Sequence, residues 1–440
     1  MTQRQVTVIG GGPSGMMAAI AAARCGASVR LLEKERRPGT KLLLTGNGKC
    51  NLSNTDPHLT VRYHSDSLKE VPAFTASAFE TLGPEQTIRL FEEMGLLCTV
   101  REQSAGKFRM LTAAGAPEPE IMEGYVYPAS GQSSSVLSVL NAEMERLNVR
   151  VKCSNQVDAL KRETDGTWSV TVNGYTFLTD AIVLCCGSAS RPSAGGSGSG
   201  YDLARSCGHS VTPVHPALTG LTSDSPFLAD TGSVRVLGSV RLAASSGKGD
   251  PVRFCSELER GEVQLGNNYI SGIPIFQISR YVHELKEGGL TVCVCLDLLP
   301  DQTAEETQLR LAQLADYYRP SPVAAAWAGL FPSQVLKALL RQLQLAPGTP
   351  AADAAAAMTR LCRQIMIEVN SVRGFEQAQV CAGGVDPREV RPDTLESRIA
   401  PGLYLAGELL DIDGPCGGYN LQWAWSSGYL AGMAAAGGRS

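Results

Sequence analysis

Three glycines near the N-terminus, Gly10, Gly12 and Gly15, have the spacing G-x-G-x-x-G. They follow the apolar run QVTVIG and precede a segment rich in small apolar residues, so we expect them in a turn between a strand and a helix. In such a turn the first glycine permits a tight bend, the second lets the backbone approach a pyrophosphate, and the third lets the helix pack closely on the strand. The pattern therefore predicts a dinucleotide site, with the phosphates at the helix N-terminus.

Glu33 adds a second part to this site. It ends the next apolar run, about 20 residues after the first glycine, where an acidic residue binds a ribose hydroxyl and disfavours a 2′-phosphate. FAD and NAD both use this arrangement. The glycine-rich stretch near residue 198 is not a second copy, because Tyr201 and Leu203 occupy its third-glycine positions. A single dinucleotide site in a chain with large insertions favours a tightly bound flavin over an exchanging nicotinamide.

Two further glycine-rich segments are placed to contact a flavin. Residues 39–54, GTKLLLTGNGKCNLSN, contain a TGNG core that offers backbone N–H groups with little steric bulk. We expect residues 406–432 to run from the end of a strand through a glycine-rich turn into a helix that begins near Gly418. The partial positive charge at that helix N-terminus would stabilise the negative charge of a reduced flavin, and Glu408 is placed to accept a hydrogen bond from a ribityl hydroxyl.

Together these segments resemble a family of bacterial FAD-dependent oxidoreductases that includes BaiN-like reductases and aminoacetone oxidases. The resemblance also covers GYVYPASGQSSSVLSVL from residue 124, IVLCCGSASRPSAGG from residue 182 and CAGGVDPREVRPDTLESRIAPGLYLAGE from residue 381, and so extends over most of the chain. Where the family commonly has ATGG, this chain has Cys185-Cys186-Gly187-Ser188, and its segment Gly266–Tyr269 also departs from the family pattern.

The resemblance implies a flavoprotein that binds FAD and takes electrons from NADH or NADPH as a transient donor. The FAD contacts that it implies, together with the glycines of the three motifs, are Gly10, Gly12, Ser14, Gly15, Glu33, Lys34, Lys41, Thr45, Gly46, Asn47, Gly48, Val157, Gly187, Gly407, Glu408, Gly418, Tyr419, Asn420 and Leu421.

A few side chains near these motifs are candidates for proton or electron transfer. Tyr127 and Tyr419 are the phenols nearest the motifs and are the candidates for protonating a substrate. Cys416 and Cys50 lie in the glycine-rich segments, and each is either a redox thiol or a residue that holds the backbone shape. The second role is favoured because neither has a partner at C-x-x-C spacing. His209 is expected to be a buried structural histidine, and the spacing of residues supports no metal site.

Three functions remain open from the residues and the resemblance. In the first, reduced FAD gives a hydride from N5 to a C=C bond conjugated to a carbonyl, as in a 3-oxo-Δ4 steroid or bile-acid-like substrate. In the second, FAD oxidises an amine of the aminoacetone type and produces hydrogen peroxide. In the third, the chain is a non-catalytic flavin-binding redox protein. Apolar and aromatic residues in the insertion, such as Tyr269, Phe276 and Phe331, favour a flat apolar ligand, although such residues are more often plain core.

The order of expected elements predicts an α/β fold: a Rossmann-like (glutathione-reductase-type) FAD-binding domain with a β-rich insertion and a small helical insertion. Strand, glycine turn, helix and strand at the N-terminus predict a parallel sheet. Residues 133–147 have helical periodicity, and Asn173-Gly174 predicts a hairpin. We expect a discontinuous FAD domain at 1–200 and 365–440, a β-rich substrate domain at 201–300 with 362–375, and a helical flavin-shielding domain at 301–361.

Composition limits the partners. The 440 residues include 39 Lys and Arg against 43 Asp and Glu, and 43% are hydrophobic. This balance predicts no nucleic-acid or membrane partner. The resemblance, with the apolar residues of the insertion, implies a small, apolar, carbonyl-containing substrate. The N-terminus has no signal-peptide pattern, so we expect a cytoplasmic protein in which the 13 cysteines are free. Cys293 and Cys295 alternate in the strand-like run TVCVCLDL, where we expect them to act as small core residues.

Overall fold

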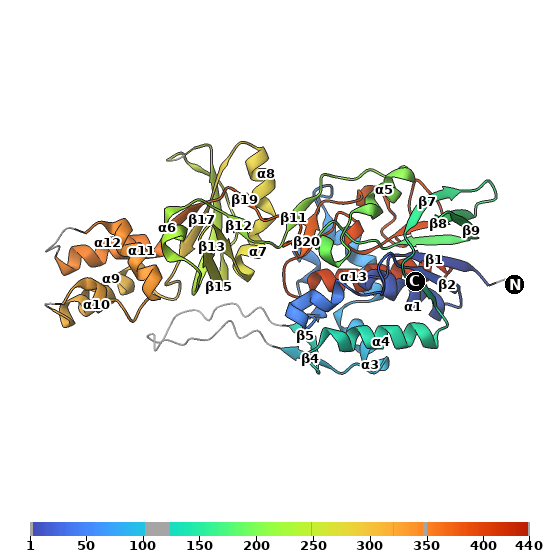
Figure 1. The fold of residues 1–440 in the computed structure, drawn as a ribbon, viewed down its shortest axis with the longest axis horizontal. Helices are drawn as coiled ribbons and strands as arrows, with labels where there is room; N and C mark the ends of the chain where they lie inside the picture. Colours follow the sequence, from blue (N-terminus) through green and yellow to red (C-terminus); the bar gives the residue numbers. More distant parts are fainter. Residues whose placement is uncertain (1–2, 102–123, 248, 320, 346–349, 439–440) are drawn as a thin grey trace. The chain divides into compact units, whose positions relative to one another are not determined.

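The structure is a computed structural model that describes residues 3–101, 124–247, 249–319, 321–345 and 350–438. The chain forms two compact units, the first made of Met1–His215 and Gln379–Ser440 and the second of Pro216–Ala378 (Figure 1). The first unit is therefore built from both ends of the chain. The finer division into three domains, with its boundaries at 200, 300 and 365, stays a prediction.

A five-stranded parallel sheet forms the centre of the first unit. Its central strands are apolar because both faces of a parallel sheet are covered, and all four residues of β10 are buried. The chain leaves β1 in one direction to reach β2 and returns on the other side as β10, so the strand order reverses at β1. In such sheets ligands bind beyond the carboxyl ends of the strands at this point. In sheet order the strands are β21 (Leu403–Leu405), β10 (Ala181–Leu184), β1 (Gln5–Ile9), β2 (Ser28–Leu32) and β6 (Arg150–Lys152).

Two helices from opposite ends of the chain pack on each other in this unit. They are α1 (Pro13–Arg24) and α13 (Tyr419–Ala435), seen together beside β1 in Figure 1. A Cβ on Gly428 would lie 2.2 Å from the carbonyl oxygen of Ser14, and one on Gly432 would lie equally close to that of Ala18. Only glycine lets the two backbones approach so closely, and the C-terminal motif is thereby held against the N-terminal one.

Smaller elements complete the first unit. Strands β7 (Val157–Arg162), β8 (Trp168–Val172) and β9 (Tyr175–Thr179) form an antiparallel meander. Asn173 and Gly174 join β8 to β9 with φ angles of 50° and 80°, as the predicted hairpin turn requires. The remaining α-helices and β-strands are β3 (Ser53–Asn54), α2 (Val71–Thr81), α3 (Pro84–Glu93), β4 (Cys98–Arg101), β5 (Tyr125–Pro128), α4 (Ser133–Arg146), α5 (Ser199–Ser206), β11 (His215–Ala217), which runs into the second unit, and β20 (Val380–Ala382).

The second unit contains an eight-stranded antiparallel sheet with helices. The sheet order is β18 (Ile365–Glu368), β17 (Thr291–Asp297), β13 (Val234–Ser245), β15 (Glu259–Gly266), β16 (Tyr269–Ser271), β12 (Leu221–Thr222) and β19 (Ser371–Val372), and β14 (Val252–Cys255) also pairs with β13. The helices are α6 (Pro226–Thr231), α7 (Ile273–Ser279), α8 (Tyr281–Glu287), α9 (Ala304–Tyr317), α10 (Val323–Ala326), α11 (Ser333–Leu343) and α12 (Ala351–Arg363).

One face of this second sheet packs on a core, and the alternation along β17 shows which side chains face it. Val292, Val294 and Leu296 are fully buried, whereas Cys293 and Cys295 are only partly buried on the other face. The expectation that the two cysteines are core residues was therefore wrong. Their neighbours are larger and more apolar, and strand alternation places only one of the two sets against the core.

No helix in the described ranges is both long and apolar enough to cross a membrane.

Candidate cofactor-binding site

The turn after β1 has the geometry that a pyrophosphate site requires. Gly10 has a φ of 103°, and a Cβ there would lie 2.4 Å from the carbonyl oxygen of Cys185. A Cβ on Gly15 would lie 1.8 Å from the carbonyl oxygen of Gly10. Around Gly12, by contrast, a Cβ would meet no described atom within 4 Å. The first and third glycines are therefore demanded by packing, and the second borders open space that a ligand can enter.

The helix that follows this turn presents its N-terminus to the same space. Gly12 is the N-cap residue of α1 and Pro13 is the first helical residue, and no side chain among the described residues caps the helix. The first N–H groups of the helix are therefore left for another acceptor, and the helix dipole favours an anion there.

Glu33 lies where the sequence predicted a ribose-binding carboxylate, at the end of β2. Its side chain is 8% exposed. One carboxylate oxygen accepts a hydrogen bond from the Gly11 N–H at 2.6 Å, and the other accepts one from the Glu35 N–H at 2.8 Å. Each oxygen keeps a further lone pair, so the carboxylate is held in place and can still accept a hydroxyl donor.

Three other predicted contacts flank this carboxylate or follow a neighbouring strand. Lys34 comes directly after Glu33, and its Nζ lies 3.6 Å from Glu35 Oε1. Val157 is buried at the start of β7. Gly187, with a φ of 66°, follows β10, and a Cβ on it would meet no described atom within 4 Å. The structure thus leaves space at Gly187 as well as at Gly12.

Glu408 is the centre of a polar cluster that joins four distant segments. Its Oε2 lies 2.7 Å from Lys41 Nζ, and its Oε1 accepts hydrogen bonds from Ser188 Oγ at 2.6 Å and from the Cys381 N–H at 3.1 Å. Lys41 Nζ also donates to Ser190 Oγ at 2.5 Å. Ser188 replaces a glycine of the family pattern, and its hydroxyl orients the carboxylate. Lys41 and Glu408, both predicted FAD contacts, are therefore held together.

The TGNG segment forms an irregular turn. Gly46, Asn47 and Gly48 have φ angles of 55°, 54° and 85°, and Thr45 Oγ1 donates to the carbonyl of Leu42 at 2.6 Å. No described atom lies within 4 Å of a Cβ placed on Gly48. Successive left-handed residues turn the backbone N–H groups outward, which suits contact with an acceptor.

A buried acceptor without a partner lies next to this loop. Asn51 Oδ1 is inaccessible to solvent and receives no hydrogen bond from any described residue. It lies 2.9 Å from where a Cβ of Gly418 would be, at the N-terminus of α13. A buried carbonyl oxygen without a donor is costly, so this position calls for a ligand N–H or O–H. Sequence reasoning missed Asn51, although it lies within the second glycine-rich segment.

The turn before α13 is closed by a predicted contact residue. Asn420 Oδ1 accepts from the Gly414 N–H at 2.9 Å, and its Nδ2 donates to the Gly414 carbonyl at 2.7 Å. Gly418 is the N-cap, and no side chain of the described chain caps the helix. The side chain of Asn420 thus shapes the turn, and the backbone N–H groups of Tyr419, Asn420 and Leu421 are the groups at the helix N-terminus that a cofactor can use. Open space at three glycines, two uncapped helix N-termini and the unpartnered Asn51 oxygen fit a bound FAD.

Gly407 ties this C-terminal motif to α1. It has a φ of 74°, and a Cβ on it would lie 2.5 Å from Ser14 Oγ. Its N–H donates to Ser427 Oγ at 2.9 Å. Ser14, Gly407 and Glu408 are therefore brought to one place from opposite ends of the chain.

Tyr419, one of the two proton-donor candidates, is held in a buried network. Its ring is 1% exposed, and its Oη donates to Asp56 Oδ2 at 2.7 Å. Asp56 Oδ2 also lies 3.1 Å from Arg62 Nε, and Tyr63 Oη donates to the Tyr419 carbonyl at 2.8 Å. Burial, and then the Asp56 carboxylate, raise the pKa of Tyr419 well above its usual range. The Tyr419 hydroxyl therefore donates its hydrogen to Asp56, and its role in protonating substrate stays a prediction.

Tyr127, the other candidate, lies beside the TGNG segment. It belongs to β5 and is partly buried. Its Cε1 atom is 3.8 Å from where a Cβ of Gly46 would be. This phenol therefore borders the predicted flavin site, and its catalytic role also stays a prediction.

The candidate thiols are both protonated at neutral pH. Burial raises the pKa of Cys416 to about 11 and that of Cys50 to about 12. Cys416 Sγ lies 3.9 Å from Gln379 Oε1, and Cys50 has a φ of 57°. All cysteines among the described residues are free. These features favour a structural role for both over the redox role that a thiolate would need.

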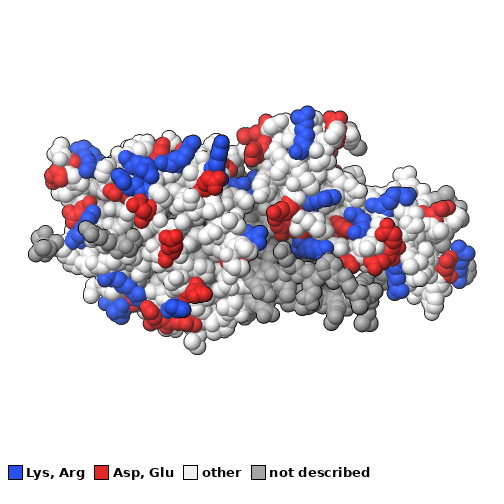
Figure 2. All heavy atoms as spheres, turned by 180° about the vertical axis from the view of Figure 1, so that it is seen from behind, with Lys and Arg blue, Asp and Glu red and all other residues white. Residues whose placement is uncertain are grey.

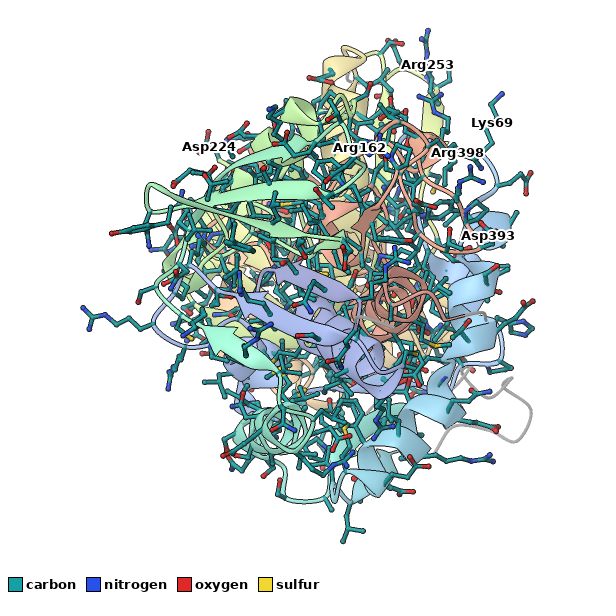
Figure 3. The ribbon with its side chains drawn as sticks, turned by 90° about the vertical axis from the view of Figure 1, so that its right-hand side faces the viewer. Lys69, Arg162, Asp224, Arg253, Asp393 and Arg398 are labelled. Atoms are coloured by element: carbon teal, nitrogen blue, oxygen red, sulfur yellow. The ribbon has the colours of Figure 1, made fainter. Side chains whose placement is uncertain are left out.

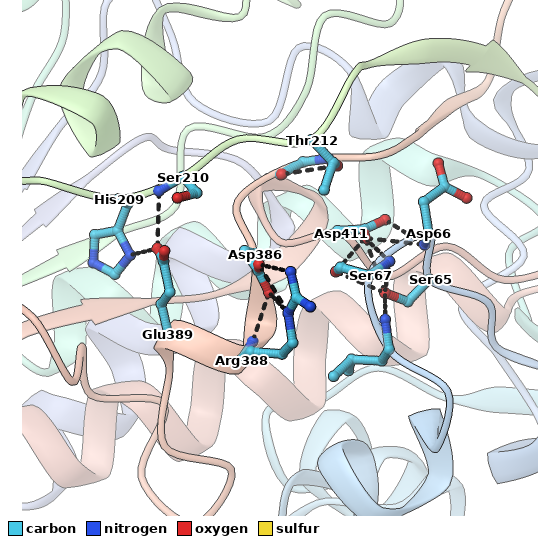
Figure 4. Close-up of polar contacts among 12 residues, drawn as sticks. Ser65, Asp66, Ser67, His209, Ser210, Thr212, Asp386, Arg388, Glu389 and Asp411 are labelled. Carbon is cyan, nitrogen blue, oxygen red and sulfur yellow. Dashed lines mark hydrogen bonds and ion pairs between the residues drawn. The ribbon is translucent and has the colours of Figure 1, made fainter.

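Acidic side chains hold together segments of the first unit that are distant in sequence, as Figure 4 shows. Asp411 is fully buried and accepts hydrogen bonds from the N–H groups of Asp66 and Ser67 and from Ser67 Oγ. His209 Nδ1 lies 3.1 Å from Glu389 Oε2, and burial lowers the pKa of this histidine. His209 is thus held as a buried structural residue. The described residues contain no group of three His, Cys, Asp or Glu side chains that could hold a metal ion.

Comparison with known proteins places this geometry in a family. The model of the HI0933-like protein Rossmann domain matches residues 4–434. The chain is 38% identical over 438 residues to a 3-dehydro-bile acid delta(4,6)-reductase of Clostridium scindens, covering 98% of this chain and 99% of that protein. It is 26% identical over 434 residues to a ribosomal RNA dihydrouridine synthase of Escherichia coli, covering 98% and 97% of the two chains.

A solved structure has a more distant likeness. The 3-ketosteroid-delta4-(5alpha)-dehydrogenase of Rhodococcus jostii matches with a TM-score of 0.45 and 18% identity, over 98% of this chain and 97% of that one. The family match confirms the predicted Rossmann-like α/β fold class.

Proposed function

Because the chain belongs to the HI0933-like Rossmann family, we propose that it reduces a carbon–carbon double bond conjugated to a carbonyl group, in a 3-oxo-Δ4 steroid or bile-acid-like substrate. The predicted family and the predicted class, an FAD-dependent oxidoreductase acting on a CH–CH group, are confirmed.

One observation carries the proposed reaction: 38% identity, over nearly the whole length of both chains, to a relative named as a bile acid delta(4,6)-reductase. A second relative is named as a ribosomal RNA dihydrouridine synthase. Dihydrouridine is uridine with two hydrogens added across a ring double bond that is conjugated to a carbonyl. The two names thus describe different substrates but the same kind of bond, which supports the type of reaction beyond any one substrate.

The residues of the site have separable tasks in this proposal. Bound FAD supplies hydride chemistry at its N5. The turn Gly10–Gly15 and the N-terminus of α1 bind the pyrophosphate, and Glu33 binds the ribose. Asn51 Oδ1 accepts a hydrogen bond from the cofactor. Tyr127, which lies beside Gly46, is the group we propose to protonate the substrate carbon next to the carbonyl.

The electron donor in this proposal is NADH or NADPH, bound transiently. The sequence contains no second G-x-G-x-x-G that would form a separate site for it. The nucleotide would therefore dock transiently over the flavin, and reduction of the flavin by another carrier is the alternative.

Uridine in ribosomal RNA is a second candidate substrate, because relatives from both Escherichia coli and Haemophilus influenzae are named as its dihydrouridine synthases. The surface is of mixed charge on the face in Figure 2, where basic and acidic side chains are interspersed. Lys69 and Arg253 extend outward from the ribbon in Figure 3. The net charge of −4 also lacks the basic excess typical of RNA binding, so the steroid-like substrate is favoured.

The test is anaerobic mixing of the yellow holoprotein with NADH or NADPH, followed by a 3-oxo-Δ4 steroid acid. We expect one nucleotide to bleach the flavin and the enone to restore its colour, while the matched saturated 3-oxo acid does not. Recolouring by unmodified ribosomal RNA alone would assign the second substrate. Anaerobic bleaching by aminoacetone, peroxide formation when air is then admitted, and no reaction with either C=C substrate would refute the proposal.

A further inference from the structure

A pocket with three arginines in its lining lies within the second unit, on the sheet face opposite the core. Its volume is about 260 Å³. None of its residues is among the predicted cofactor contacts. The lining residues are Ser239, Arg241, Leu258, Arg260, Cys295, Asp297, Pro300 and Arg363.

Strand register brings five of these side chains together. Ser239 on β13 pairs with Arg260 on β15 and with Asp297 on β17, so the three lie in one row across the sheet. Arg241, two residues further along β13, pairs with Cys295. Residues two apart on a strand share a face, so both rows point to the same side. The arrangement of these five side chains follows from the strand backbone.

Two of the arginines already have acidic partners. Arg363 Nη2 lies 3.0 Å from Asp297 Oδ2, and its Nη1 donates to the Leu299 carbonyl at 3.0 Å, which fixes the guanidinium. Arg260 Nη1 lies 3.0 Å from Asp301 Oδ1, in a pair whose side chains are 42% and 65% exposed. Such an exposed pair is weak, so Arg260 can turn toward a better acceptor.

Arg241 is the uncompensated charge of the pocket. Its partner among the described residues is the Cys295 thiol, and no described carboxylate lies within 4 Å of its guanidinium. Of the three guanidinium groups of the pocket, two are paired with Asp297 and Asp301, and that of Arg241 leaves one positive charge uncompensated. This excess of positive charge calls for an anion.

The remaining wall is apolar. Leu258, which is 53% exposed, and Pro300 complete the pocket beside the guanidinium groups. A guanidinium matches the two oxygens of a carboxylate or phosphate with parallel hydrogen bonds. We propose that this pocket binds an oxyanion, a carboxylate or a phosphate, with Arg241 as the principal donor and with the apolar wall contacting the body that bears the anion.

The proposal is tested by calorimetric titration of the holoprotein, so binding is measured whether or not the chain reduces an enone. The two probes are sodium phosphate and cholate, a steroid carboxylate without an enone, in Tris chloride at low salt, because sulfonate buffers carry a competing oxyanion. The methyl ester of cholate reports the part of the binding that needs the carboxylate.

Arg241→Gln is the test variant, and Arg235→Gln is its matched control. Arg235 lies on the same face of β13, pairs with Glu262 at 3.1 Å and is not part of the pocket. We expect Arg241→Gln to weaken binding about tenfold, the size of one charge-assisted hydrogen bond, and Arg235→Gln to leave it unchanged. Both positions are exposed, so both variants should keep the flavin spectrum and the melting temperature.

The pattern of binding identifies the source of the anion. Arg241-dependent binding of cholate but not of phosphate or the ester assigns the pocket to a carboxylate on an apolar body. Arg241-dependent binding of phosphate assigns it to a phosphate group. The proposal is overturned if neither probe saturates, or if the two variants weaken binding equally, since the charge of the whole surface would then be responsible.

Discussion

Replacement of Tyr419 by phenylalanine separates a structural from a catalytic role for this buried phenol. The change removes one hydroxyl, which donates to Asp56 Oδ2 at 2.7 Å. A hydrogen bond to a charged group contributes about 1.5–3 kcal/mol, and Asp56 keeps Arg62 and the His58 N–H as partners. We therefore expect the free energy of unfolding of the first unit to fall by roughly 1.5–3 kcal/mol.

The expected effect on turnover is small by comparison. Replacing a positioning residue whose partner remains held should lower the rate of flavin reoxidation by enone less than about tenfold, whereas loss of a general acid lowers such a rate about 10²–10⁴-fold. Tyr127→Phe should show the second pattern, with nearly unchanged stability, because this ring is only partly buried.

Tyr63→Phe is the matched control, since Tyr63 is equally buried and donates to the Tyr419 carbonyl at 2.8 Å. Urea unfolding followed by tryptophan fluorescence gives the stability, and single-turnover mixing of reduced protein with enone gives the rate. The structural role of Tyr419 would be refuted if Tyr419→Phe lowered the rate more than about 100-fold without changing the free energy of unfolding, while Tyr63→Phe left the rate unchanged. Tyr419 would then be the proton donor.

Three further predictions concern the cofactor and acid stability. The Gly12→Val variant should fold but lose FAD, because the valine side chain would fill the open space after β1. The ratio of flavin to protein absorbance measures the loss of FAD, and Gly329→Ala, a change at another glycine in open space, is the control. Asn51→Ala should weaken FAD binding about tenfold with little change in apoprotein stability, because Asn51 Oδ1 has no donor among the described residues. Titration of the apoprotein with FAD measures the affinity, and an unchanged affinity would contradict a contact between Asn51 and the cofactor. Hydrogen bonds from Arg146 and Arg24 lower the pKa of Glu143 from 4.5 to about 2, so its contribution to stability is complete above pH 4.5 and is lost as the pH falls toward 2. The Glu143→Gln variant should therefore be less stable than the unchanged protein at neutral pH and should lose less stability on acidification, as urea titrations at several pH values measure. Parallel plots of stability against pH for the two proteins would contradict this prediction.

Much of the fold followed from local sequence. The glycine turn at 10–15, the helix at 133–147 and the hairpin at Asn173-Gly174 all depend on residues close together in the chain. Gly10 and Gly174 adopt positive φ angles of 103° and 80°, as their turns require. These features could be predicted because backbone preference and apolar periodicity act over a few residues.

Other features could not be predicted, because they depend on which distant segments meet. The phenol of Tyr419 looked available in the sequence, but the fold places Asp56 against it. Cys295 looked like a core residue, but register places it on the outer face opposite Arg241. Asn51 gave no signal of an unpaired oxygen, since every Asn has the same donors and acceptors until its neighbours are known.

The sequence by itself determined the glycine turn between β1 and α1 and the position of Glu33 after the next strand, because glycine spacing and strand length act locally. From these features it predicted a dinucleotide site with an acidic residue for the ribose. Only the tertiary structure decided that Lys41, Ser188 and Glu408 share one polar cluster, and that three arginines line a pocket on the second sheet. The reason is physical: hydrogen bonds and charge interactions act over a few ångströms, and chain folding alone brings residues hundreds of positions apart within that range.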